Sequence, residues 1–233
     1  MKNLIGIIYQ PKKVFEKIVN NKGGWISAII VIVLLLFIIA IFNSGVSEQI
    51  MNKSKIFQRF SSDQIATIKA TAHKMKYIGM AISSILFVFK IILLGLLLFG
   101  GTLLFKGKAK FGQIMSVLVY SYIVIVLGDC VNLFAMYMRG LDAIKSTNDI
   151  NLIGINVFFN CDNISNALYT FYSQINLFQV WFISLLIIGL TLVAKIEIWK
   201  STILVLVYWL IITALPILLA YVSEMVVRNA GVM

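Results

Sequence analysis

The sequence is poor in the residues that most enzymes use for chemistry. Among 233 residues it contains one histidine, two cysteines and nine acidic residues. One histidine, His73, and two distant cysteines cannot supply the ligands of a structural metal site. Metal-dependent intramembrane enzymes need clusters of histidine and carboxylate such as H-E-x-x-H, and the chain has none. We therefore expect no metal, no cofactor and no metal-dependent catalysis.

The sequence also gives little indication of a serine–lysine catalytic dyad or of a disulfide bond. Ser83 and Ser84 precede Lys90 by almost two helical turns, so the sequence places no serine–lysine dyad. Cys130 and Cys161 lack the spacing of a disulfide framework. A bond between these two cysteines stays open, because it requires Cys161 outside the membrane and Cys130 near the outer end of its helix.

Apolar residues dominate what is there. They make up 61% of the chain, and the mean hydropathy is +0.97, whereas soluble domains are about 45–50% apolar. A bilayer core is about 30 Å thick and needs about 20 apolar residues per helix. We predict an all-α integral membrane helix bundle, with a domain over 25–233 whose five transmembrane spans are about 25–43, 77–105, 112–138, 176–194 and 201–223. No soluble domain or nucleotide-binding loop is apparent, and no signal-peptidase site follows the first span.

Residues 1–24 form a separate amphipathic segment. Pro11 suits the first turn of a helix, because its missing N–H is not needed there. After it, Phe15 lies with other apolar residues on one face, opposite Lys12, Lys13 and Lys17. This pattern predicts an interfacial helix that lies on an anionic lipid leaflet.

The net charge of +11 has two readings. No basic stripe with interleaved aromatic residues is present on a soluble face, so we expect no nucleic-acid partner. The lysines instead flank apolar spans, where they set topology. The short turns 106–111 and 195–200 are both basic and fall on the same side as the N-terminus. We expect the N-terminus inside and the C-terminus outside, although the segment 44–76 is also basic.

Two charged residues interrupt the second and third spans. Lys90 and Asp129 lie at comparable distances from Lys108, the middle of the turn between these spans. At about 1.5 Å per residue, they can lie level on antiparallel helices, so we predict that they form an intramembrane charge pair. Such residues usually face a bundle interior and have a partner.

Three interpretations of these charges remain open. The pair can fix how two helices dock, since polar groups hold transmembrane helices together. It can instead form a site with a polar pocket that includes Ser83, Ser84 and Asn132. Alternatively, the charges do not meet, and Lys90 snorkels to a water boundary. Whether the asparagine-rich stretch 150–160 re-enters the membrane is also open.

Three stretches carry a resemblance to a known family. They are "YQPKKVFEKI" (9–18), "FGGTLLFKGKAKFGQIMSVLVYSY" (99–122) and "FQVWFISLLIIGLTLVAKIEIWKS" (178–201). With five spans in this order, the chain resembles the Yip family (Ypt/Rab-interacting-protein type) of polytopic membrane proteins, in its bacterial branch. The Gly-Tyr-Ser…Pro pattern of the family survives as Tyr120-Ser121, with Val119 and Val124 at the flanking positions.

The resemblance implies a function without catalytic residues. Eukaryotic members are scaffolds in vesicle traffic, and some bacterial members resemble accessory subunits of ABC-type exporters that act in antimicrobial-peptide resistance. The Ile-, Lys- and Asn-rich usage is typical of an AT-rich bacterial genome. We therefore expect a non-enzymatic accessory or scaffold protein of a bacterial cytoplasmic membrane, with a membrane-protein partner such as an ABC transporter, or self-association. The alternative is a small transporter or channel that uses Lys90 and Asp129.

Overall fold

The structure is a computed structural model that describes residues 2–20, 24–53, 61–140, 150–159 and 164–229. Five of its helices are long and apolar enough to cross a membrane, which confirms the predicted number of spans. Cys161 and the sequence around it lie outside the described residues, and Cys130 is a free thiol. The elements in chain order are α1 (Lys2–Tyr9), α2 (Pro11–Asn20), α3 (Trp25–Lys53), α4 (Ser62–Leu104), α5 (Phe111–Arg139), η4 (Ile155–Phe158), α6 (Asn166–Ser173), α7 (Leu177–Ala194) and α8 (Ile198–Asn229).

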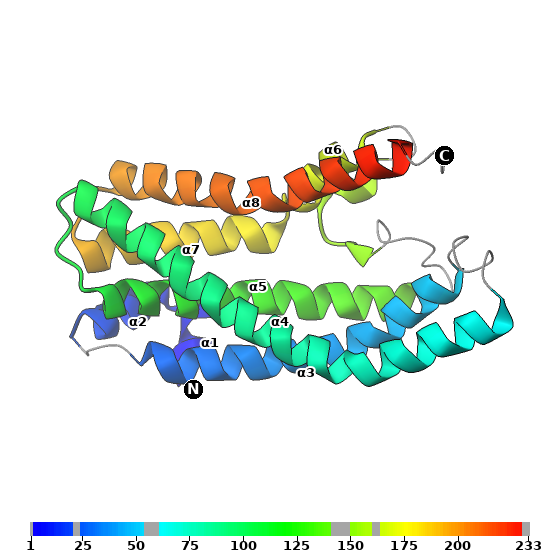
Figure 1. Cartoon of the computed structure of the whole chain (residues 1–233). Helices are drawn as coiled ribbons and strands as arrows, with labels where there is room; N and C mark the ends of the chain where they lie inside the picture. Colours follow the sequence, from blue (N-terminus) through cyan, green and yellow to red (C-terminus); the bar gives the residue numbers. More distant parts are fainter. Residues whose placement is uncertain (1, 21–23, 54–60, 141–149, 160–163, 230–233) are drawn as a thin grey trace.

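The two ends of the bundle differ. One end, which we name the turn end, carries the α4–α5 turn (105–110) and the α7–α8 turn (195–197), and α2 lies beside it (Figure 1). The two turns touch, since the Lys108 N–H donates to the Ala194 carbonyl over 3.0 Å. The opposite end, which we name the loop end, carries α6, η4 and the C-terminal part of α8.

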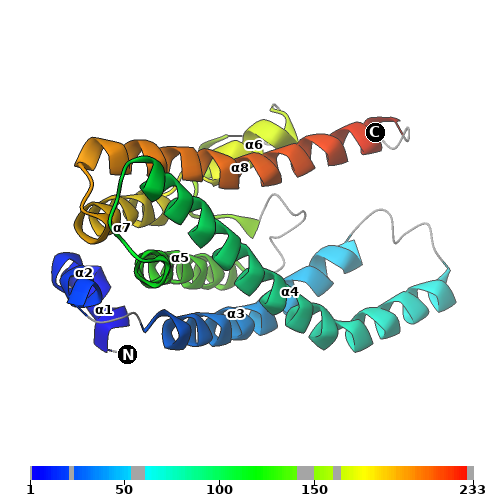
Figure 2. The ribbon, with the colours of Figure 1, turned by 60° about the vertical axis from the view of Figure 1, so that its left-hand side comes forward.

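Helix α5 is the centre of the bundle. In its most apolar window 67% of the residues are buried, against 22% for α3, α4 and α8. Figure 2 shows α5 enclosed by α3, α4 and α7. Val117, Leu118 and Val124 on α5 are fully buried. The side chains of α5 therefore meet protein on most sides, whereas the other spans keep a broad apolar face toward lipid.

Helix α4 is longer than any bilayer requires. A capping box starts it: Gln64 N–H donates to Ser61 Oγ over 3.3 Å, and Ser61 N–H donates to Gln64 Oε1 over 3.0 Å. From there the helix continues for 43 residues to Leu104, about 64 Å at 1.5 Å per residue. The polar stretch before the second span and the span itself are thus one helix, whose first turns project past the end of α5 (Figure 1).

The N-terminal segment packs on protein. Helix α2 begins at Pro11 as predicted, and its Lys12, Lys13 and Lys17 are exposed. Its apolar face, however, does not lie in lipid: Phe15 is 0% exposed and sits against α7. A Cβ added to Gly189 would lie 2.9 Å from the Phe15 ring. The amphipathic pattern shows that one face is buried, but it does not say whether lipid or protein covers that face.

Candidate functional site

The register between α4 and α5 decides whether the two charged residues meet. Three side-chain contacts define it along the length of the hairpin: Phe99 with Phe111, Gly95 with Met115, and Phe87 with Tyr122. The first two pairs are mirror positions about residue 105, and the third agrees with this register to within one residue. The first residue of α5 is therefore level with Phe99, and α4 overshoots the start of α5 by about one helical turn.

This register separates Lys90 from Asp129. Lys90 is level with Tyr120, about nine residues before Asp129, which is about 13 Å along the axis of α5. Both residues are described, and no salt bridge joins them within 4.0 Å. The predicted charge pair is wrong, because the register between the two helices is centred on residue 105 and not on Lys108, the middle of the turn.

Lys90 lies on the outer surface of α4. Its side chain is exposed, and the neighbouring Phe89 and Leu93 are 65% and 55% exposed. No hydrogen bond or ion pair connects it with any described residue. A lysine thus stands without a counter-ion on an apolar face that the bundle does not cover.

Ser83 and Ser84 are not part of a pocket with Asp129. They line a small apolar groove of about 180 Å³ between α3 and α4, together with Phe37 and Met80. Ser84 Oγ donates to the Met80 carbonyl of its own helix over 2.9 Å. The expected polar pocket that joins these serines to Asn132 does not form, because the serines face α3, whereas Asn132 faces the segment 150–153 and the α6–α7 junction.

Asp129 instead lines a polar cavity at the loop end. The cavity has a volume of about 270 Å³. Its floor is α5, its wall is the junction between α6 and α7, and its roof is the segment 150–153. The roof and the wall come from the stretch between the third and fourth spans, whose asparagines were the only sequence signal for this arrangement.

Asn132 builds the roof of this cavity. Its Nδ2 donates to the Ile150 carbonyl over 2.9 Å, and its Oδ1 accepts from the Leu152 N–H over 2.8 Å. The side chain therefore pairs with the backbone as a neighbouring strand would. Further along the roof, Ile155 N–H donates to the Ile175 carbonyl over 3.0 Å, which ties the segment to the start of α7. Asn132 shares the cavity with Asp129, and its amide groups serve to position the loop.

The carboxylate of Asp129 has no partner among the described residues. None of their N–H, O–H or charged groups bonds to it. The N-terminus of α7 reaches the cavity, but its capping bond goes elsewhere: the Gln179 N–H donates to Asn176 Oδ1 over 2.8 Å. The side chains of Gln174 and Gln179 also line the cavity without a hydrogen bond. The site thus presents one unpaired anion and two unbonded amides.

The salt bridge that the described residues do form lies at the turn end of the bundle. Lys200 Nζ is 3.3 Å from Glu197 Oε1 beside the α7–α8 turn. The Trp199 indole also donates to Glu197. The hydrogen bond from the Trp199 indole has the largest effect on the pKa of the Glu197 carboxyl, and the bond and charge of Lys200 follow. Together they lower this pKa below its usual value. The Glu197 side chain is 62% exposed, so this ion pair lies on the surface.

No metal centre is apparent in the described part of the chain, which brings no three His, Cys, Asp or Glu side chains together.

A family comparison matches residues 5–221 to the Yip1 domain. No curated protein and no solved structure matches the chain. The match begins within α1, covers α2 and the first four spans, and ends within the fifth span.

Proposed function

Since the chain belongs to the Yip1 domain family of integral membrane proteins, we propose that it is a non-enzymatic accessory protein that binds another membrane protein through α4. The observation that carries this proposal is Lys90, an unpaired charge on an exposed apolar helix face. An ionisable residue inside a membrane is costly unless it has a partner or reaches water. A partner helix with a carboxylate at the same depth would satisfy it.

The depth of Lys90 disfavours snorkelling. Lys90 is level with Tyr120, about 14 Å along α5 from its first residue at the turn end. The hydrocarbon core is about 30 Å thick, so the Lys90 backbone lies near its middle. A lysine side chain reaches the interface when it starts near the end of a span, and Lys90 starts at the greatest distance from both interfaces.

A second copy of the chain does not supply the missing carboxylate. Apart from Asp129, the acidic residues that the structure describes fall in α2, near the ends of α3, α4 and α8, or in the α7–α8 turn, and the other three lie in the sequence between α5 and α6. In a symmetric dimer within one membrane, Asp129 of the second copy would lie at its own depth, about 13 Å from the level of Lys90. The counter-ion therefore belongs to a different protein, whose transmembrane helix carries Asp or Glu.

The family resemblance favours an ABC-type exporter of antimicrobial-peptide resistance as this partner, in a bacterial cytoplasmic membrane. We assign the turn end to the cytoplasm, which puts the N-terminus inside and the C-terminus outside. Support comes from the lysines of α2 and of both short turns, which gather at that end (Figure 1), as the positive-inside rule favours. The alternative of a transporter or channel required Lys90 and Asp129 in one path, and the register separates them.

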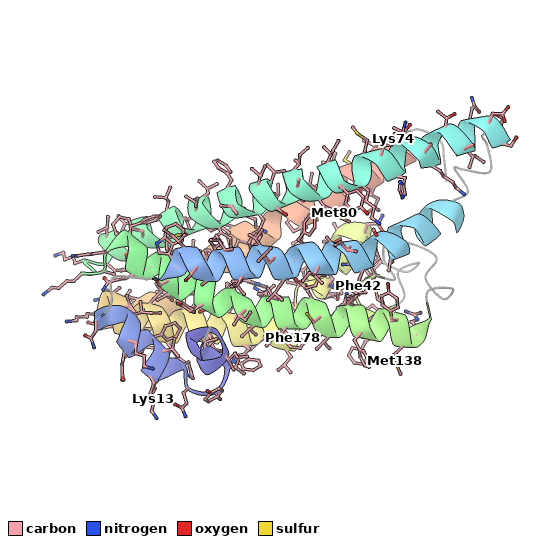
Figure 3. The ribbon with its side chains drawn as sticks, turned by 90° about the horizontal axis from the view of Figure 1, so that it is seen from below. Lys13, Phe42, Lys74, Met80, Met138 and Phe178 are labelled. Carbon is pink, nitrogen blue, oxygen red and sulfur yellow. The ribbon has the colours of Figure 1, made fainter. Side chains whose placement is uncertain are left out.

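The test is affinity purification of the tagged chain from native membranes in a mild detergent. We expect a stoichiometric membrane protein to co-purify with the wild-type chain and with Lys90→Arg, which keeps the charge. Lys90→Met should lower its recovery about tenfold or more, because it leaves a buried carboxylate of the partner unpaired. Lys74→Met is the matched control, since Lys74 is exposed on the projecting part of α4 (Figure 3).

A charge exchange makes this test specific. Lys90→Asp should abolish recovery, and replacing one acidic transmembrane residue of the partner by Lys should restore it. Equal recovery with Lys90→Met and with the wild-type chain would contradict the proposal, as would purification of the wild-type chain without any stoichiometric partner.

A further inference from the structure

We propose that the cavity around Asp129 binds a primary ammonium group. This inference goes beyond the accessory function and does not depend on it, since the cavity lies on the α7 side of α5 and Lys90 lies on the outer surface of α4. The cavity is formed by three separate segments and has a volume of about 270 Å³. It is large enough for several waters or a small organic group, because about 10–15 Å³ of such volume accommodates one water.

The charge of the site selects a cation. Asp129 contributes a carboxylate, and no Lys or Arg lines the cavity. The N-terminus of α7 adds about half a positive charge nearby, but none of its N–H groups donates to Asp129. Waters can fill the cavity and solvate the carboxylate, but they leave its negative charge in place. A bound cation would neutralise that charge.

The ligand chemistry selects an ammonium over a bare metal ion. A Ca²⁺ ion requires about six to eight oxygen ligands within 2.6 Å, usually from several carboxylates, and this cavity offers a single carboxylate in a wide space. A primary ammonium has three N–H donors. Three side-chain groups that line the cavity have acceptors without a hydrogen bond, namely the carboxylate of Asp129 and the amides of Gln174 and Gln179, which gives one group for each donor.

Two sources could provide this group. Asp129 lies about 27 Å along α5 from its start at the turn end, which is close to the headgroup level of the opposite leaflet. A phosphatidylethanolamine headgroup or a free small amine could therefore reach the cavity. Both present the same ammonium, and the experiment separates them.

The experiment measures thermal unfolding of the purified chain with two probes. The first is ethylammonium, titrated into the chain in nanodiscs of phosphatidylcholine, with sodium and tetramethylammonium at matched ionic strength. The second is the exchange of phosphatidylcholine for phosphatidylethanolamine in the nanodisc. The variants are Asp129→Asn, which keeps the shape and removes the charge, and Asp63→Asn, which changes an exposed carboxylate at the start of α4.

We expect ethylammonium to raise the unfolding temperature more than sodium or tetramethylammonium does. Its apparent affinity should fall about tenfold or more in Asp129→Asn, because a hydrogen bond to a charged group is lost, and should be unchanged in Asp63→Asn. Stabilisation by phosphatidylethanolamine that Asp129→Asn removes would identify the lipid as the source, and stabilisation by ethylammonium alone would identify a free amine. Equal responses to all three cations, a response that persists in Asp129→Asn, or no response to either probe would overturn the proposal.

Discussion

Replacing Phe15 by alanine is expected to release α1 and α2 from the bundle and to lower the free energy of unfolding by about 3–5 kcal/mol, the range for Phe→Ala in a packed core. The Phe15 ring is fully buried and fills the space left by Gly189 on α7. The side chains of Ile7, Val14 and Ile18 are buried with it in the same core. One side-chain hydrogen bond supports the attachment, from Gln113 Nε2 to the Val19 carbonyl over 3.2 Å.

The measurement is hydrogen exchange of residues 2–20 together with equilibrium unfolding in detergent. Phe134→Ala is the matched control, since Phe134 is 66% exposed on α5 and its truncation opens no cavity. We expect fast exchange of the N-terminal helices in Phe15→Ala and unchanged exchange in Phe134→Ala. If the apolar face of α2 lay in lipid, as the sequence alone suggests, the two variants would behave alike.

Replacing Asn132 by alanine is expected to detach the roof of the Asp129 cavity. The substitution removes both bonds to the backbone of 150–152. At about 0.5–1.5 kcal/mol per hydrogen bond, plus the desolvation of backbone groups left without a partner, the loss is about 1–4 kcal/mol. Because the spans do not depend on this loop, the effect should stay local.

Limited proteolysis and hydrogen exchange of 150–158 measure this effect. Both rates should rise in Asn132→Ala while exchange in α5 and α7 stays unchanged. Ser84→Ala serves as the control, because its hydroxyl bonds within its own helix. Unchanged protection of 150–158 would show that the contacts of η4 and α6 hold the roof without Asn132.

The sequence predicts the features of this fold that depend on local pattern. Apolar runs of about 20 residues give the five spans, Pro11 gives the start of α2, and Ser61 with Gln64 gives the start of α4. Each of these rests on hydropathy or on hydrogen bonds within a few residues, which the sequence displays directly.

The candidate site depends on packing between helices, which the sequence displays poorly. Gly95 accepts the Met115 side chain, and this close fit draws the start of α5 back along α4. The turn 105–110 connects the end of α4 to the earlier level at which α5 starts, and Lys106 in this turn adopts the left-handed backbone conformation. A shift of this size moves a residue to a different level and to a different neighbour. For this reason Lys90 and Asp129 do not meet. Asp129 and Asn132 share a cavity because they are three residues apart and lie on one face of α5.

The length of α4 has a geometric consequence. If the hydrocarbon core starts level with Phe99, its far side is near residue 79, so about 17 residues of the helix lie beyond it and span about 26 Å along the helix. The helix is continuous, but it bends between this projecting part and the span (Figure 2). The tip near Ser62 therefore stands less far from the bilayer than the length of the helix alone would give, and it is offset sideways from the axis of the span.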